Sequence, residues 1–530
     1  MLGWKENRRN EGEKAMNGAE SLMQTFVDSG VNVCFTNPGT SEMHCVAALD
    51  RIQGVRGVLG LFEGVVSGMA DGYARMAGKP AFTLLHLGPG LSNASANIHN
   101  ARRARTPMIN VVGDHATYHL AYDAPLASDI MGLAKPVSHW LHSSKDANSL
   151  AADGANAVAA AMTYPGQIAT LVVPANCAWD EAGGPAKPVA PPPVPRTEDG
   201  IITAAARMLK NGRKTMLLMN GPALSRRGTH AAGRIAAASG ARLVCDTFIG
   251  RIERGAGCVT LEKMPYFAED MVEFLKGTEQ LILVGTKPPV SFFAYPGKPG
   301  WLTPDGCETL ILATAQQDGV HALEALASEL NAPAAPALVQ QAARPTLPTG
   351  GQFNAHTIGA ALGALMPENA IVSDEAATSG FACYAPTAGV APVDWLGLTG
   401  GSIGQGVPLA AGAAVACPDR KVVCLSGDGG GMYTLQALWT MAREKLDVVT
   451  VVFSNRKYLI LQVELMRVGA GNPGRRALDL LDLSNPDLNW VQLANGMGVE
   501  ASRATTQEEF NHQFAAAAKA RGPHLIEAVI

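Results

Sequence analysis

The chain has 530 residues, too many for one hydrophobic core, and a prior of roughly 150 residues per domain predicts about three domains. Hydrophobic residues make up 47% of the chain and charged residues 17%, which excludes collagen-like, coiled-coil and disordered proteins. The net charge is −4, so no basic excess is available to bind nucleic acid.

The first fifteen residues, MLGWKENRRNEGEKA, are polar and show no hydrophobic periodicity. We expect a disordered extension at 1–15, with folded structure from Met16 onward. The N-terminus lacks the apolar segment of a secretory signal, and no apolar run reaches the about 18 residues that span a bilayer. Nine cysteines, from Cys34 to Cys424, include no pair at C-x-x-C spacing. These features predict a soluble cytoplasmic protein with reduced thiols and no membrane partner.

Apolar strand-like runs alternate with helical stretches along the rest of the chain. The runs lie at 31–36, 82–87, 108–113 and 169–174, then at 215–221, 241–247, 281–286 and 309–314, and finally at 370–375, 421–429, 447–455 and 523–530. Proline- and alanine-rich linkers at 186–196 and 332–351 separate three blocks, 16–185, 197–331 and 352–530. The pattern predicts an α/β fold of three doubly wound parallel-sheet domains, with ligands beyond the carboxyl ends of strands.

A glycine-rich turn follows the predicted strand KVVCLS in the third block. It reads Gly427-Asp428-Gly429-Gly430-Gly431 and leads into a predicted helix at 432–445. Glycine allows backbone N–H groups to approach an anion closely. Because Asp428 would repel a phosphate, its presence predicts a divalent cation between the two, and Mg²⁺ commonly combines protein oxygens with phosphate.

A second polar group follows the next predicted strand. Asn455 follows Gly429 after 25 intervening residues, at the end of DVVTVVFS. Parallel neighbouring strands end at the same edge of a sheet, so the Asn455 oxygen and a nearby backbone carbonyl could complete the metal site.

This spacing of GDG and Asn resembles the diphosphate-binding signature of thiamine-diphosphate (ThDP) enzymes. The order of blocks resembles their pyrimidine-binding, middle and pyrophosphate-binding domains, and the likeness covers Met16 to Ile530. Within the family the pattern resembles the benzoylformate decarboxylases and, next, the acetolactate synthases. The resemblance implies that Asp428, Asn455 and the Lys457 carbonyl hold Mg²⁺, while Gly427, Gly429 and Gly430 contact the diphosphate.

Glu63 lies between a short apolar run and a predicted helix at 65–76. Taken alone, it could simply stabilise the start of that helix. The resemblance implies instead that it shares a proton with N1′ of the aminopyrimidine. Ile403, at the start of a predicted helix at 402–416, matches the bulky residue that props the cofactor in its bent shape. The resemblance also implies cofactor contacts for Gly401, Ser402 and Thr378.

Two further residues of the first block match catalytic positions of the family. His86 matches the pyrimidine-domain histidine of the benzoylformate decarboxylases, and Thr40 matches a serine that contacts the substrate carboxylate. For His115 and His119, the sequence leaves two roles open: one in the active site, and one at the surface or in the structure.

The chain departs from the family pattern around the substrate. Phe293 lies nearest the place of a second catalytic histidine, and Ile460 and Glu464 replace a small and an aromatic residue of the aryl pocket. Pro125-Leu126 stands where acetolactate synthases have Phe-Gln. We therefore expect Phe293, Ile460, Glu464 and Leu126 to line a pocket that favours short or polar aliphatic 2-oxo acids.

Three functions stay open. The resemblance favours non-oxidative decarboxylation of a 2-oxo acid by ThDP and Mg²⁺, with carboligation as a side activity. The alternatives are an acetolactate synthase-like carboligase and a catalytically silent ThDP-fold subunit. FAD, which acetolactate synthases hold in the middle domain, is possible but not indicated by the sequence. Because the family binds pyrimidine and diphosphate on different subunits, we expect a homodimer or homotetramer.

Overall fold

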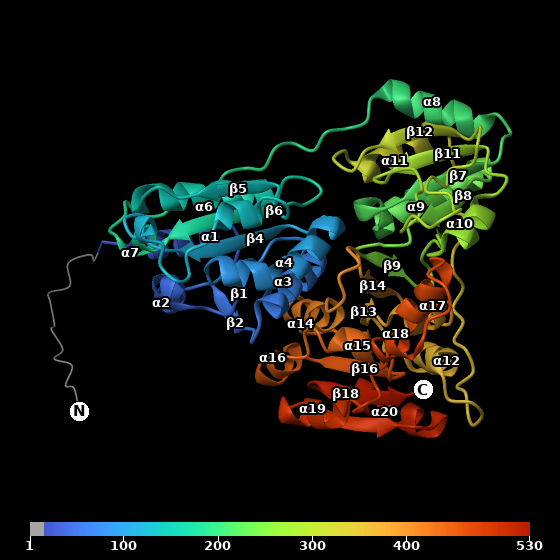
Figure 1. The fold of residues 1–530 in the computed structure, drawn as a ribbon. Coiled ribbons are helices and arrows are strands. Elements are labelled where there is room, and N and C mark those ends of the chain that lie inside the picture. The colour runs from blue at the N-terminus through green and yellow to red at the C-terminus, as the bar shows by residue number, and fades with distance from the viewer. Residues whose placement is uncertain (1–14) are drawn as a thin grey trace.

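The computed structural model describes residues 15–530, so the predicted disordered extension lies outside the described residues except for Ala15. The described chain folds into three α/β parts, each around its own mainly parallel sheet (Figure 1). The predicted fold class is therefore confirmed. The limits predicted for the domains stay a prediction, and 183–198 contains no helix or strand ahead of α8 at Asp199.

The first part is a six-stranded, all-parallel sheet covered on both faces. Its strand order is β2 (Arg56–Leu59), β1 (Val33–Thr36), β3 (Phe82–Leu85), β4 (Met108–Asp114), β6 (Ile168–Pro174) and β5 (Trp140–Ser143). One face packs against α1 (Gly18–Asp28), α2 (Met43–Arg51) and α6 (Ala147–Ala161). The other packs against α3 (Glu63–Ala77) and α4 (Leu87–Ala104). Short elements complete this part: η1 (Thr40–Glu42), η2 (Leu120–Tyr122), α5 (Ile130–Ala134) and α7 (Ala175–Trp179).

The middle part is a smaller parallel sheet of five strands. Their order is β10 (Glu262–Lys263), β8 (Arg242–Cys245), β7 (Thr215–Met219), β11 (Gln280–Val284) and β12 (Glu308–Ala313). One face carries α8 (Asp199–Lys210), η3 (Gly221–Leu224), α9 (Arg226–Ser239) and α11 (Gly319–Glu329), and the other carries α10 (Ala268–Leu275).

The third part has seven strands, one of which comes from the middle block. The order is β17 (Glu500–Ala504), β18 (His524–Val529), β16 (Val448–Ser454), β15 (Val422–Gly427), β13 (Ile371–Glu375), β14 (Val393–Gly397) and β9 (Ile252–Arg254). Its helices are α12 (Ala355–Leu365), α13 (Ala377–Tyr384), α14 (Gly406–Ala416), α15 (Asp428–Gly431), α16 (Ala437–Arg443), α17 (Leu459–Arg467), α18 (Arg475–Asp479), α19 (Trp490–Gly496) and α20 (Gln507–Lys519).

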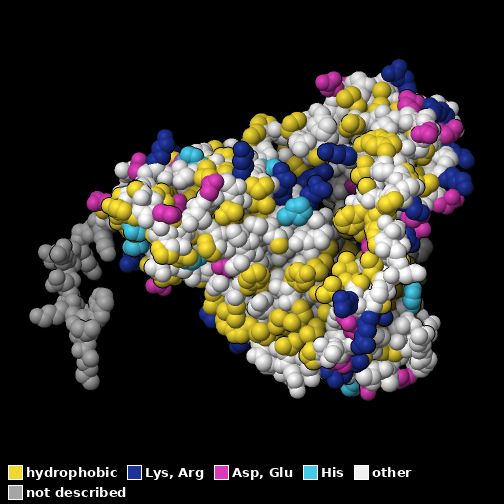
Figure 2. Space-filling model, viewed as in Figure 1, with side chains coloured by type: hydrophobic (Ala, Val, Ile, Leu, Met, Phe, Trp, Pro, Cys, Tyr) yellow, Lys and Arg dark blue, Asp and Glu magenta, His cyan; other side chains and the backbone are white. Residues whose placement is uncertain are grey.

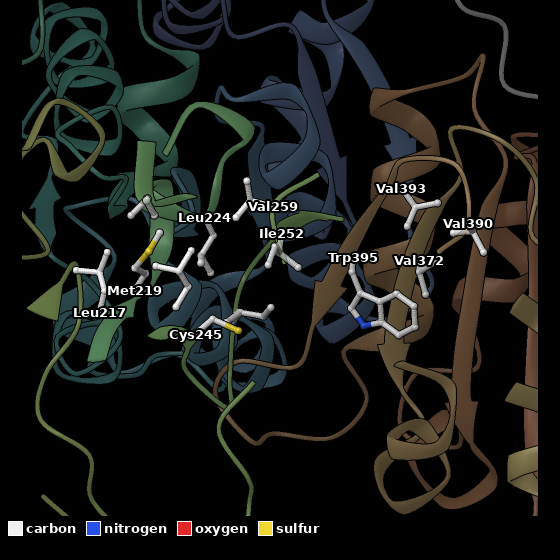
Figure 3. Packing of buried hydrophobic residues seen from close by; sticks show 14 of the residues in the cluster. Leu217, Met219, Leu224, Cys245, Ile252, Val259, Val372, Val390, Val393 and Trp395 are labelled. Carbon is white, nitrogen blue, oxygen red and sulfur yellow. The ribbon is translucent and has the colours of Figure 1, made fainter. Parts of the chain in front are cut away.

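Strand β9 pairs antiparallel with β14, unlike all other pairs in this sheet. The Arg254 guanidinium, at the end of β9, lies 3.7 Å from the centre of the Tyr384 ring. It also donates a hydrogen bond of 2.8 Å to Thr387 Oγ1. Ile252 packs in one hydrophobic cluster with Trp395 of β14 and with the middle-block core (Figure 3). The middle and third parts therefore share a continuous core.

Helices α3 and α14 join the first and third parts. They approach so closely that a Cβ atom on Gly72 would lie 2.0 Å from the Leu409 carbonyl oxygen, and one on Gly412 would lie 1.9 Å from that of Met69. Glycine at these two positions is therefore needed for the packing. Beside this contact, the fully buried Asp71 carboxylate accepts from Arg75 at 2.7 Å and from Thr106 at 2.7 Å. The interface is thus both apolar and charge-compensated.

Two helices differ from the predicted bounds. The helix predicted at 402–416 begins at Gly406, because Gly401 and Gly404 adopt positive φ angles of 75° and 95° and form a loop. The helix predicted at 432–445 occupies 437–443, because residues 432–436 form turns, one of which is closed by the hydrogen bond from the Thr434 amide to the Gly431 carbonyl. Among residues 15–530, no helix is long and apolar enough to cross a membrane, and all nine cysteines are free thiols.

Candidate active site

Asp428 lies where β15 ends and α15 begins, and its side chain is buried at 3% exposure. Its Oδ1 atom accepts from the Gly429 amide at 2.9 Å, and its Oδ2 atom accepts from the Arg456 amide at 2.6 Å. Burial raises the pKa of Asp428, and these amides oppose the rise. Because β15 and β16 are parallel neighbours, the GDG turn and the 455–457 loop meet at one edge of the sheet.

The groups at this edge fit a magnesium diphosphate. Asn455 Oδ1 accepts from the Lys457 amide at 3.1 Å, which places the amide oxygen on the loop that Asp428 contacts. Within 15–530 no cluster of three His, Cys, Asp or Glu side chains could hold a metal. A carboxylate, an amide oxygen and a backbone carbonyl would instead leave coordination positions for phosphate oxygens, as Mg²⁺ prefers.

The glycines of the turn also fit a close ligand approach. A Cβ atom on Gly429 would lie 2.4 Å from Cε1 of Tyr458. A Cβ atom on Gly427 would have no other atom within 4 Å. A Cβ atom on Gly430 would lie 3.5 Å from Oε1 of Glu375. The turn is therefore packed on one side and open on the other.

The loop that holds Gly401, Ser402 and Ile403 is fixed by Glu375, a residue that the sequence reasoning missed. Glu375 ends β13, and its two carboxylate oxygens accept from the backbone amides of Gly404 and Gly406. Burial raises its pKa to about 7 against the effect of these amides. Thr378 follows three residues later, on α13. One buried carboxylate thus binds the Ile403 loop and faces the glycine-rich turn.

Glu63 is the first residue of α3 and is buried at 8% exposure. Its Oε2 atom accepts from Asn93 Nδ2, on α4, at 3.0 Å, and its Oε1 atom faces Gly90. The amide of Asn97, one turn further along α4, donates to the Gly64 carbonyl at 2.8 Å and to the Gly404 carbonyl at 3.1 Å. Asn97 therefore joins the backbone beside Glu63 to the backbone beside Ile403.

His86 precedes α4 and pairs with a second residue that the sequence reasoning missed. Its Nδ1 atom lies 2.8 Å from Oε2 of Glu42, whose side chain is 1% exposed. Glu42 also accepts from the Gly39 amide at 2.9 Å and from the Ser41 hydroxyl. A Cβ atom on Gly39 would lie 2.1 Å from the ring nitrogen, so glycine there makes room for the imidazole. A carboxylate thus fixes the orientation of the ring.

The other predicted residues of the first part are Thr40, Leu126, His115 and His119. Thr40, the first residue of η1, is exposed. Leu126 is 44% exposed, and the nearby Ser128 lies against Gly88, at the start of α4. The His115 and His119 rings lie 5.5 Å apart after β4, and His115 Nε2 is buried without a hydrogen-bond partner in the described chain.

The predicted pocket residues of the other parts form a separate group. Ile460 and Glu464 lie one turn apart on α17, and Glu464 is bound by the Tyr295 hydroxyl. The Phe293 ring lies 6.3 Å from that of Tyr295 and is 52% exposed. The structure therefore brings Phe293, Ile460 and Glu464 together, while Leu126 lies in the first part of the chain.

A cavity of about 350 Å³ lies elsewhere, between the first and middle parts. Its lining includes Arg75, Arg105 and Arg251 but none of the predicted site residues. On the face drawn in Figure 2, Lys and Arg side chains gather at a hollow between these two parts. This cavity is distinct from the places that hold Asp428 and Asn455 and from those that hold Glu63 and His86.

The chain is similar to known proteins over almost its whole length. The thiamine pyrophosphate enzyme N-terminal TPP-binding domain matches residues 16–149, and the C-terminal TPP-binding domain matches 384–528. A Mycobacterium tuberculosis protein provisionally named acetolactate synthase large subunit IlvX is 52% identical over 521 residues, which cover 97% of this chain and 99% of that protein.

More distant similarities agree. Benzoylformate decarboxylase of Pseudomonas aeruginosa is 27% identical over 528 residues, covering 94% of this chain and 96% of that enzyme. The ThDP-dependent 4-hydroxybenzoylformate decarboxylase of Rhodococcus jostii RHA1 has the same fold, with a TM-score of 0.83, 24% identity and coverage of 96% and 98% of the two chains. The chain therefore belongs to the thiamine-diphosphate-dependent enzyme family.

Proposed function

We propose that the protein uses ThDP and Mg²⁺ to decarboxylate a 2-oxo acid without oxidation, with carboligation as a side activity. In this reaction the bond between C1 and C2 breaks, CO₂ leaves and C2 takes a proton, which gives an aldehyde. The observation that carries the proposal is the His86–Glu42 pair, because proton transfer at these steps needs an imidazole held in one orientation.

The chain offers residues for each part of the cofactor. Asp428, Asn455 and the Lys457 carbonyl would hold Mg²⁺, and the glycines at 427, 429 and 430 would face the diphosphate. The loop and helix residues that would contact the rest of the cofactor are Gly401, Ser402, Ile403 and Thr378. When bound, ThDP supplies the electron sink for the carbanion that decarboxylation leaves.

Glu63 would exchange a proton with the pyrimidine N1′ atom. Its burial and its single amide donor, Asn93, keep water from competing for the carboxylate. His86 would donate or accept the proton at the reacting carbon, and the Thr40 hydroxyl would bind the substrate carboxylate. Exposure of Thr40 leaves that hydroxyl open to a ligand.

Acetolactate synthase-like carboligation is the second candidate. The 52% identity to IlvX favours it, since that relative carries the name of such a synthase. The Pro125-Leu126 pair weighs against it, because the acetolactate synthase pattern of Phe-Gln is missing there. Both reactions would use the same cofactor-binding residues. They differ in what reacts with the carbanion that decarboxylation leaves.

A panel of 2-oxo acids tests the proposal. We expect CO₂ release from pyruvate or 2-oxobutanoate that depends on ThDP and Mg²⁺, and a free aldehyde when no acceptor is added. Acetolactate as the main product would favour the second candidate. Bound ThDP with no turnover of any 2-oxo acid would indicate a silent subunit. A preference for benzoylformate of about tenfold or more would contradict the predicted pocket of Phe293, Ile460, Glu464 and Leu126.

The proposed active site would be shared by two chains, so we expect a homodimer or homotetramer. Glu63 of one chain and Asp428 of another would serve the same cofactor. Mixing inactive Glu63→Gln chains with inactive Asp428→Ala chains during refolding or co-expression should restore activity, because some interfaces then carry both native residues. No recovery in proven mixed oligomers would contradict shared sites.

A further inference from the structure

The Glu464 carboxylate is buried at 9% exposure, and its two oxygens differ in their partners. Oε2 accepts from the Tyr295 hydroxyl, which the middle block contributes. Oε1 is buried and has no hydrogen-bond partner among residues 15–530. A buried acceptor without a donor costs free energy, so a donor from outside the chain would fit this atom.

The nearby cations are bound to a different carboxylate. Glu269 pairs with Lys298 at 2.8 Å and with Arg467 at 3.2 Å. Arg467 also stacks 3.7 Å from the centre of the Phe267 ring. Within the described chain, Glu464 forms no ion pair at 4.0 Å or less. An anion buried without a cation is unfavourable, and a cationic ligand would compensate it.

The phenols around Glu464 supply dipoles and no charge. Burial and then the Glu464 carboxylate raise the pKa of Tyr295 to about 12, and the same causes raise the pKa of Tyr266. Both hydroxyls therefore stay protonated at neutral pH. They orient the carboxylate without neutralising it.

Aromatic rings extend from the Glu464 carboxylate to the loop that holds Gly401, Ser402 and Ile403. The Phe292 ring lies 5.4 Å from the Tyr266 ring, and the Phe381 ring lies 6.5 Å from the Tyr266 ring. The tip of Phe292 lies 3.2 Å from where a Gly401 Cβ atom would be. Phe292, Phe293 and Phe381 are 44%, 52% and 56% exposed. Exposed aromatic faces beside an anion suit a cation with an apolar stem.

We propose that Glu464 selects substrates that carry a cationic nitrogen, as ammonium or guanidinium, at the end remote from the 2-oxo acid. The inference rests on the proposed function, since it names the substrate class of the same site. The aromatic rings would cover the aliphatic stem, Glu464 Oε1 would accept an N–H bond, and Tyr295 would hold Oε2 in place.

A matched pair of substrates tests the charge. 5-Guanidino-2-oxopentanoate and 5-ureido-2-oxopentanoate have nearly the same shape and differ in charge. We expect the wild type to prefer the guanidino compound by about tenfold or more in kcat/KM. Glu464→Gln should bring the ratio within about threefold of one, mainly by slowing the cationic substrate. Glu273→Gln, which changes an exposed carboxylate of the middle block, should keep the wild-type ratio.

A wild-type preference for the ureido compound, or a ratio that Glu464→Gln leaves unchanged, would overturn the inference. Tyr295→Phe keeps the carboxylate and removes its donor, so it should retain the cation preference. Loss of the preference in that variant alone would assign recognition to the phenol instead and would also overturn the inference.

A binding measurement separates this inference from the proposed function. n-Propylguanidinium should raise the Tm of the ThDP-loaded wild type more than n-propylurea does, and Glu464→Gln should abolish the difference. If no 2-oxo acid is turned over but this difference is present, the proposed reaction fails and the cation site stands. If turnover occurs and wild type shows neither the binding difference nor the substrate preference, the cation site fails alone.

Discussion

His86 Nδ1 lies 2.8 Å from Glu42 Oε2, and Glu42 is almost completely buried. The carboxylate has no access to bulk water, so its effect on chemistry must pass through the imidazole. Glu42 is therefore a positioning residue for His86.

Glu42→Gln should lower kcat by about tenfold or more with a smaller change in KM, because an amide orients and polarises the imidazole less well. Adding Glu42→Gln to His86→Ala should cost little more than His86→Ala alone, since the two act as a unit. Asp50→Asn, an exposed acid on α2, is the control for kinetics and Tm. A pure KM effect of His86→Ala would make it a binding residue.

Glu63→Gln should fold and bind ThDP but lose most activity, because an amide cannot exchange the proton that N1′ requires. ThDP affinity by intrinsic fluorescence, measured beside kcat, separates the two effects. Activity within about threefold of wild type would show that Glu63 has no catalytic role.

Asp428→Ala should weaken ThDP binding and remove its dependence on Mg²⁺, because the diphosphate charge is then uncompensated. Asn455→Ala should act in the same direction and more weakly, since it removes a neutral ligand. Asp479→Asn, on the exposed α18, is the control. Unchanged affinity and unchanged Mg²⁺ dependence in Asp428→Ala would place the metal elsewhere.

Glu375 should make stability depend on pH. Its pKa of about 7 in the folded protein exceeds the ordinary value of 4.5, so between these values the folded chain keeps a proton that the unfolded chain has lost. The stabilisation is fully present below about pH 4.5 and is lost as pH rises through about 7. Glu375→Gln cannot titrate, so the Tm of wild type minus that of the variant should fall from pH 5 to pH 7.5. Glu368→Gln, which is exposed, is the control. A pH-independent difference would contradict the raised pKa.

The strands and the cofactor motifs could be predicted because they are local in sequence. The GDG turn and Asn455 each follow a buried strand, and parallel pairing brings strand ends to one edge. Short edge strands such as β9 and β10 were not predicted, since two or three residues carry no detectable periodicity.

The supporting residues could not be predicted because their partners are distant in sequence. Glu42 meets His86 across 44 residues, and Glu375 meets the Ile403 loop across about 30. Glu42 follows the segment TNPGTS, and nothing local distinguishes it from a helix-capping residue. Tyr295 lies in an irregular segment of the middle block, where no periodic pattern indicates its role.

Strand β9 belongs to the middle block by sequence and to the third sheet by hydrogen bonds. A protein made of residues 352–530 alone would therefore leave one edge of β14 without its partner strand and Trp395 without part of its apolar cover. Open strand edges pair with other chains, so such a fragment should self-associate. Cutting the linker at 332–351 in the intact protein should, for the same reason, leave two pieces that migrate together until a denaturant separates them.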